Sequence, residues 1–299
     1  MLDGGLATEL ESAGHDVSSD LWSARLLRDD PGAVLAAHRA YLAAGAQVII
    51  SASYQATFEG FAAAGVGREA AAGLLRRSVE LARAAAADGD AWVAASVGPY
   101  GAMLAEGQEY TGEYVDPAWT GRPGGGLGVA ELRAFHRPRL EVLAGADPDV
   151  LACETVPCLA EAEALLAEVD RLGVPAWLSL TTVAGPDGEP LTRRGEPAAE
   201  AFAMAADVRA VIAVGVNCTA PAGVEAAVRT AAAAGGKPVV AYPNSGETWD
   251  GPGRIWRGEP GFAADDVTAW VAAGARLVGG CCRVGPEQIA DLAAVLRAT

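Results

Sequence analysis

The chain has 299 residues, of which 51% are hydrophobic and 20% are charged, which is typical of a globular protein with a large core. Its formal charge is −16 and it contains no basic run, which argues against nucleic acid or an anionic membrane as a partner. No apolar stretch approaches the ~20 residues that span a bilayer. The N-terminal residues do not resemble a signal peptide, so we expect a cytoplasmic protein.

Short apolar runs alternate with alanine-rich segments of helical period along the chain. The runs are continuous, as in parallel strands that are buried on both faces. The predicted strands cover residues 2–5, 47–51, 92–97, 150–153, 176–180, 210–216, 238–242 and 276–280. The predicted helices cover residues 32–44, 69–87, 129–144, 158–172, 197–206, 223–234, 263–273 and a last helix that begins near Pro286.

Eight strands and eight helices in strict alternation predict an α/β protein, a (β/α)8 TIM barrel that forms a single domain over residues 1–299. A doubly wound open sheet is the alternative, but no G-x-G-x-x-G motif follows the first predicted strand, so a dinucleotide site has no support. Two connections, residues 98–128 and 243–262, are unusually long and contain several Tyr or Trp residues. Insertions of this kind usually form lids or binding loops.

The active site of such a barrel lies at the carboxyl ends of its strands. The polar residues predicted to reach that face are Asp3, Ser53, Gln55, Cys153, Glu154, Asn217, Cys218, Asn244, Cys281 and Cys282. This set combines thiols with two carboxylates, and it predicts a polar, thiol-rich site.

Cys218, Cys281 and Cys282 follow two different predicted strands. Three converging thiolates suit a zinc ion with an open fourth position, and soft thiolates select Zn²⁺ over Mg²⁺ or Ca²⁺. The alternative is that the three side chains are buried packing residues, since free cysteines are among the most buried residues. The spacing alone leaves both possibilities open. We interpret Cys153 and Cys158 as packing residues.

The two carboxylates at the strand ends, Asp3 and Glu154, are candidates to bind an ammonium group, to orient a ligand or to act as acid and base. Capping of the following helices is the structural alternative. Asn217 stands directly before a proposed ligand, where it either orients the site or satisfies backbone groups.

Seven segments resemble, in order along the chain, the motifs of zinc-dependent homocysteine S-methyltransferases. They are Asp-Gly-Gly at 3–5 with Thr-Glu-Leu at 8–10, Ser-Tyr-Gln-Ala-Thr at 53–57, Ser-Val-Gly-Pro-Tyr-Gly at 96–101, Cys-Glu-Thr-Val-Pro at 153–157, Gly-Val-Asn-Cys at 215–218, Tyr-Pro-Asn-Ser-Gly at 242–246 and Gly-Gly-Cys-Cys-Arg at 279–283. The resemblance covers nearly the whole chain, and the two cysteine motifs are highly specific in combination.

The resemblance implies a (β/α)8 barrel in which Cys218, Cys281 and Cys282 bind Zn²⁺. It implies that a methyl group moves from a small-molecule donor to the zinc-bound thiolate of homocysteine, which forms methionine. No further catalytic residue is implied beyond this activated thiolate.

The resemblance also implies where homocysteine binds. Its amino group is expected near Asp3 and Glu154, with Gly4 and Asn217 as further substrate-binding residues.

Within the family, residues 53–57 with the following Glu59-Gly60-Phe61 resemble the branch that uses a sulfonium donor, S-methylmethionine or S-adenosylmethionine. Two departures from the family pattern, Thr181-Thr182 and residues 191–195, leave the donor open. The alternatives are methyl transfer to another thiol or selenol, the use of betaine, or a non-catalytic zinc or thiol sensor.

Overall fold

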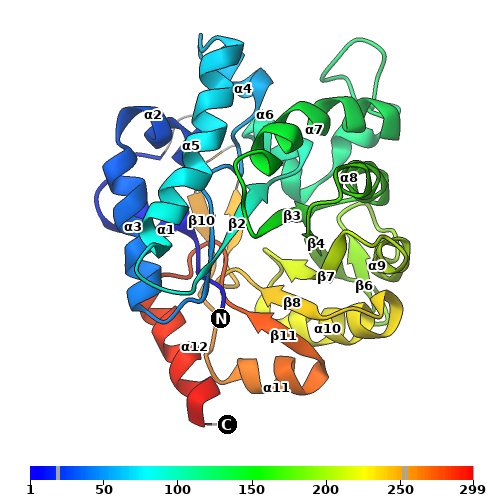
Figure 1. Cartoon of the computed structure of the whole chain (residues 1–299). Coiled ribbons are helices and arrows are strands. Elements are labelled where there is room, and N and C mark those ends of the chain that lie inside the picture. Colours follow the sequence, from blue (N-terminus) through cyan, green and yellow to red (C-terminus); the bar gives the residue numbers. More distant parts are fainter. Residues whose placement is uncertain (18–20, 251–252, 254, 299) are drawn as a thin grey trace.

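The structure is a computed structural model that describes residues 1–17, 21–250, 253 and 255–298. Seven parallel strands form one curled sheet with the order β1-β2-β3-β4-β7-β8-β11, and helices surround it (Figure 1). The strands are β1 Val48–Ile50, β2 Trp92–Val97, β3 Val150–Val156, β4 Ala176–Leu180, β7 Val211–Asn217, β8 Val239–Tyr242 and β11 Ala275–Val278. These seven strands confirm the second to eighth predicted strands.

The helices also follow the prediction, with ends that differ by three residues at most. They are α1 Leu6–Ser12, α2 Leu26–Asp29, α3 Pro31–Ala43, α4 Phe58–Ala63, α5 Arg68–Ala86, α6 Tyr100–Leu104, α7 Val129–Ala144, α8 Leu159–Leu172, α9 Ala198–Ala206, α10 Pro221–Gly235, α11 Asp266–Ala273 and α12 Pro286–Ala298. The helices α1, α2, α4 and α6 were not predicted. None of the helices in the described part of the chain is long and apolar enough to cross a membrane.

The first predicted strand, residues 2–5, differs from the expectation. Only Leu2 forms a bridge, to Val48, because Gly5 already caps α1 and leaves no room for a longer strand. The Leu2 N–H donates to the Val278 carbonyl of β11 at 2.8 Å, and the Asp3 N–H donates to the Val48 carbonyl at 3.0 Å. The N-terminal segment therefore lies between the two edge strands of the sheet.

Two apolar layers result from the curling of the sheet. One layer contains side chains from all seven strands together with Leu2, including Ala94, Ala152 and Trp177, which can meet only inside the curl. The neighbouring side chains along the same strands, such as Leu151 and Leu178, point outward into the larger core against the helices. Both faces of the sheet are thus buried, as the continuous apolar runs indicate.

The two long connections are folded rather than structureless. Residues 98–128 contain α6 and the 3-10 turns Gln108–Tyr110 and Glu113–Val115, and Glu161 of α8 anchors them by accepting hydrogen bonds from the Tyr100 N–H and the Tyr114 hydroxyl. In residues 243–262, the strands β9 Thr248–Asp250 and β10 Ile255–Arg257 form a hairpin. A further hairpin, β5 Thr182–Ala184 with β6 Pro190–Thr192, follows β4.

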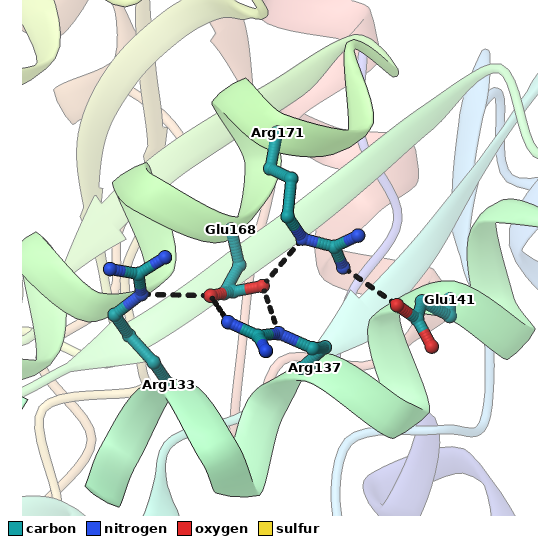
Figure 2. Close-up of polar contacts among 5 residues, drawn as sticks. All are labelled: Arg133, Arg137, Glu141, Glu168 and Arg171. Carbon is teal, nitrogen blue, oxygen red and sulfur yellow. Dashed lines mark hydrogen bonds and ion pairs between the residues drawn. The ribbon is translucent and has the colours of Figure 1, made fainter. Parts of the chain in front are cut away.

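A network of ion pairs joins α7 to α8 (Figure 2). The fully buried carboxylate of Glu168 accepts hydrogen bonds of 2.8–2.9 Å from Arg133, Arg137 and Arg171. Arg171 also bonds the exposed Glu141 at 2.9 Å. The hydrogen bonds from Arg137, Arg133 and Arg171 lower the pKa of Glu168 to about 2. Because this pKa lies below its unfolded value, the ionised carboxylate stabilises the fold.

We predict that Glu168→Gln lowers the free energy of unfolding at pH 7 by about 1–3 kcal/mol, since charge-assisted hydrogen bonds are lost. The difference in the free energy of unfolding between wild type and Glu168→Gln should be largest above the unfolded pKa of about 4.3. It should shrink as the pH falls toward 2, the pKa of Glu168 in the folded protein. Urea unfolding at several pH values between 8 and about 3.5 measures this.

The matched control is Glu141→Gln, which removes one solvent-exposed ion pair of the same network and should change stability by less than about 0.5 kcal/mol. An equal effect of both variants, or a Glu168→Gln effect that does not depend on pH, contradicts the assignment.

Candidate metal centre and active site

Three cysteine thiols converge at the carboxyl end of the sheet. Cys218 follows β7, and Cys281 and Cys282 follow β11. Their sulfur atoms all lie within 4.8 Å of one another, with 3.5 Å between Cys218 and Cys282. Tetrahedral zinc with bonds of about 2.3 Å needs sulfur atoms roughly 3.8 Å apart, so the donor set fits this ion.

The end of β8 and the residues that follow it are hydrogen-bonded to the backbone of all three cysteines. Cys218 donates its N–H to the Tyr242 carbonyl at 3.2 Å, and Cys281 donates to the Pro243 carbonyl at 2.7 Å. Ser245 donates its own N–H to the Cys282 carbonyl at 3.0 Å. Because β8 lies between β7 and β11 in the sheet, a single segment sets the separation of the three cysteines.

The backbone of Cys218 is in the left-handed region, with φ of 46°. This conformation costs a non-glycine residue about 1–2 kcal/mol, so contacts must hold it. The Cys218 carbonyl accepts hydrogen bonds from the Thr181 hydroxyl at 3.0 Å and from Arg193 at 3.3 Å, and Arg193 also bonds the Thr181 hydroxyl. The two departures from the family pattern thus meet at this carbonyl.

Asn217 lies beneath the thiols and is fully buried. Its Oδ1 accepts hydrogen bonds from the Thr155 N–H and the Ser179 hydroxyl, both at 2.7 Å, and its Nδ2 donates to the Thr155 hydroxyl at 2.6 Å. Nδ2 is also 3.9 Å from the sulfur of Cys281. Asn217 does not line the cavity described below, and its hydrogen bonds join the strand ends that carry Thr155 and Ser179.

Glu154 comes from the end of β3 and lies in a polar setting. Its Oε1 accepts a hydrogen bond from the Ser96 hydroxyl, and its Oε2 accepts one from Tyr242 at 2.9 Å. The Tyr242 oxygen in turn accepts a bond of 3.0 Å from the Trp177 indole. Burial raises the pKa of Glu154 to about 7, although the bonds from Ser96 and Tyr242 lower it. Removal of solvent thus makes a cationic partner favourable here.

Asp3 is buried on the neighbouring N-terminal segment. Its Oδ2 accepts a hydrogen bond of 2.7 Å from the Ile50 N–H, whereas its Oδ1 is buried and has no partner. Burial raises the pKa of Asp3 well above its usual range, and the charge of Glu154 adds to this effect. A buried oxygen without a donor is costly unless a ligand supplies one.

A cavity opens above the thiols. Its wall includes Cys218, Cys281, Cys282, Glu154, Gly4, Gln55, Glu109, Tyr110, Trp249 and Trp256. Gly4 is required there because a Cβ would lie only 2.3 Å from the Val284 carbonyl. No Lys, Arg or His lines this cavity within the described residues.

The other residues predicted at this face have different positions. Ser53 is buried and donates to the Ser96 carbonyl, and Asn244 accepts a bond from the Gly246 N–H beside an adjoining cavity. Cys153 packs into the outer core, and Cys158 is buried directly before α8; both lie outside the three-thiol cluster.

The 3-10 turn Gln108–Tyr110 brings Glu109 and Tyr110 to the cavity. Tyr110 belongs to the aromatic residues of the predicted binding loop, whereas Glu109 was not predicted. The Tyr110 hydroxyl lies 3.8 Å from the Cys282 sulfur. The only signal in the sequence was the aromatic content of residues 98–128. Ser96 and Tyr242, which hold Glu154, were quoted in motifs but received no role.

Comparison with known proteins agrees with this site. The profile described as homocysteine S-methyltransferase matches residues 1–296. The chain belongs to the homocysteine S-methyltransferase family. It is 43% identical to homocysteine S-methyltransferase 4 from Zea mays, covering 99% of this chain and 89% of that protein, and 42% identical to homocysteine S-methyltransferase from Escherichia coli K12, covering 98% and 94%. The metallated form of the homocysteine methyltransferase MmuM from Escherichia coli has a TM-score of 0.83, with 40% identity over 98% of this chain and 94% of that one.

For this member of the homocysteine S-methyltransferase family, we predict that Cys218→Ala abolishes metal binding, because two thiolates remain where three converge. Zinc content of purified, reduced protein should fall to less than about one tenth of the wild-type value. Cys153→Ala, which removes a thiol outside the cluster, should keep its zinc. Full zinc retention by Cys218→Ala in a folded protein would remove Cys218 from the ligand set.

Proposed function

We propose that this methyltransferase transfers a methyl group from a sulfonium donor, S-methylmethionine or S-adenosylmethionine, to homocysteine. The observation that carries the proposal is the convergence of three thiols at a cavity that carboxylates and aromatic rings line. Family membership supports the same reaction class.

We propose Zn²⁺ as the ion on Cys218, Cys281 and Cys282. Three cysteinates select a soft ion of this kind and leave it with a net charge of −1. When bound, the ion deprotonates an incoming thiol at neutral pH, whereas a free thiol with a pKa of about 8.5 is mostly protonated. The excess negative charge of the three cysteines keeps the acceptor sulfur electron-rich.

Asp3 and Glu154 are proposed to hold the amino group of homocysteine. The Oδ1 of Asp3 lacks a hydrogen-bond donor, and the pKa of Glu154 is raised to about 7 by burial, so an ammonium group would favour both carboxylates in their ionised form. Ser96 and Tyr242 fix the Glu154 carboxylate, and Gly4 lies in the same cavity wall as Glu154. This positioning lowers the barrier by reducing the freedom of the bound acceptor.

The cavity favours a cationic donor. Glu109 and Glu154 lie in its wall with Tyr110, Trp249 and Trp256, and aromatic rings attract cations. The departing group of a sulfonium is a neutral thioether, so the reaction needs no general acid. That agrees with the absence of histidine from the described cavity wall.

We also propose that residues 1–299 form one (β/α)8 domain in which the N-terminal segment is the eighth barrel member. The support is that Leu2 and Asp3 bond both edge strands.

All five cysteines are free thiols, which supports the proposed cytoplasmic location, where thiols stay reduced.

The test is methionine formation by the reduced, zinc-loaded full chain from homocysteine with S-methylmethionine, S-adenosylmethionine or betaine. Turnover with a sulfonium donor that a chelator removes and added zinc restores is the expected result. Turnover with betaine alone would overturn the donor assignment. Zinc binding without turnover on homocysteine would favour another acceptor, such as a different thiol or a selenol, or a sensor.

We predict that Glu154→Gln raises the KM for homocysteine by about tenfold or more, because a charge-assisted hydrogen bond is lost, while zinc content is unchanged. Steady-state kinetics at saturating donor measures this effect. Glu163→Gln, an exposed carboxylate on α8, is the control and should behave as wild type. An unchanged KM in Glu154→Gln would exclude Glu154 from acceptor binding.

A further inference from the structure

Two carboxylate oxygens in the described part of the chain are buried without a hydrogen-bond partner, Asp3 Oδ1 and Glu109 Oε2. Every other carboxylate oxygen that is buried there has a donor. Such orphan oxygens are unfavourable in an isolated protein and point to a donor that a ligand brings. The reaction proposed above uses two α-amino acids, and each carries one ammonium group.

Glu109 is placed by the middle of the connection between β2 and α7. The residue is only 7% exposed, yet it lines the cavity that the three thiols share. The next residue, Tyr110, reaches the Cys282 sulfur at 3.8 Å. Glu109 and the three thiols, which are distant in the sequence, therefore line the same cavity.

The surroundings of Glu109 are negatively charged and favour a cationic ligand. Burial raises its pKa to about 7, and a negative charge on Cys218 raises it further. The cavity wall supplies no basic side chain within the described residues to offset these charges. A carboxylate in this setting gains most from a ligand that carries positive charge and also donates hydrogen bonds.

The two cationic groups of an amino-acid sulfonium differ in this respect. The sulfonium centre carries charge but has no N–H or O–H, so it cannot satisfy Oε2. The α-ammonium group carries charge and three N–H donors. The charge of Glu154 acts on Asp3, and Gly4, the residue after Asp3, shares the cavity wall with Glu154. In the proposed function the acceptor occupies both carboxylates, which leaves Glu109 for the second amino acid.

We infer that Glu109 binds the α-ammonium group of the methyl donor and so selects sulfonium compounds that are α-amino acids. This inference rests on the proposed function. Donor selection would then depend on recognition of the amino-acid end as well as the reacting methyl group. A sulfonium without the amino group would bind without help from Glu109.

The experiment compares wild type with Glu109→Gln, using the zinc-loaded full chain and saturating homocysteine. The donors are S-methylmethionine and its analogue without the amino group, 4-(dimethylsulfonio)butanoate. We expect kcat/KM for S-methylmethionine to fall by about 10- to 100-fold in Glu109→Gln and kcat/KM for the analogue to change less than about twofold. Glu106→Gln, an exposed carboxylate of the same connection, is the matched control and should leave both values unchanged.

Calorimetric binding of S-methylmethionine without homocysteine is the second measurement, and zinc content is checked in each variant. Weaker binding by Glu109→Gln than by wild type is expected even if neither protein turns over. Equal loss with both donors, or a raised KM for homocysteine instead, would overturn the inference. If wild type binds S-methylmethionine more tightly than Glu109→Gln does but transfers no methyl group, the proposed function is contradicted while the role of Glu109 in binding is supported.

Discussion

The site depends on the hydrogen bonds that the end of β8 and the residues after it make to the residues that follow β7 and β11. Tyr242 and Pro243 accept from Cys218 and Cys281, and Ser245 donates to Cys282. Two cysteine-bearing segments that are more than 60 residues apart in the chain are thereby held at one separation. The same segment carries the Tyr242 hydroxyl to Glu154, so the three thiols and the carboxylate proposed to bind the acceptor share one support.

The negative charge of the site determines which ligands it can bind. The three thiols, Asp3, Glu109 and Glu154 are gathered where little water remains, and burial raises the pKa of all three carboxyl groups. Such a site is unfavourable when empty and is relieved by cations. A divalent metal, an ammonium group and a cationic methyl donor would each compensate this buried negative charge. Binding and the proposed chemistry thus follow from one electrostatic condition rather than from an acid–base pair.

Much of the fold could be predicted because strand burial on two faces and helical periodicity are local signals. The thiol cluster could also be predicted, since parallel strands end at the same edge of a sheet and so bring Cys218 near Cys281 and Cys282. The strand expected at residues 2–5 is reduced to one bridge because α1 begins at Leu6. Glu109 could not be found, because its place depends on how Glu161 anchors residues 98–128 through Tyr100 and Tyr114, a contact between distant segments.

Zinc-edge X-ray absorption of the reduced, zinc-loaded protein tests the central claim most directly. With three cysteine ligands and an open position, the spectrum should show three sulfur neighbours at about 2.3 Å and one lighter neighbour. Addition of homocysteine should replace the lighter neighbour with a fourth sulfur. Fewer than three sulfur neighbours before addition, or no change in the sulfur count after it, would contradict the account.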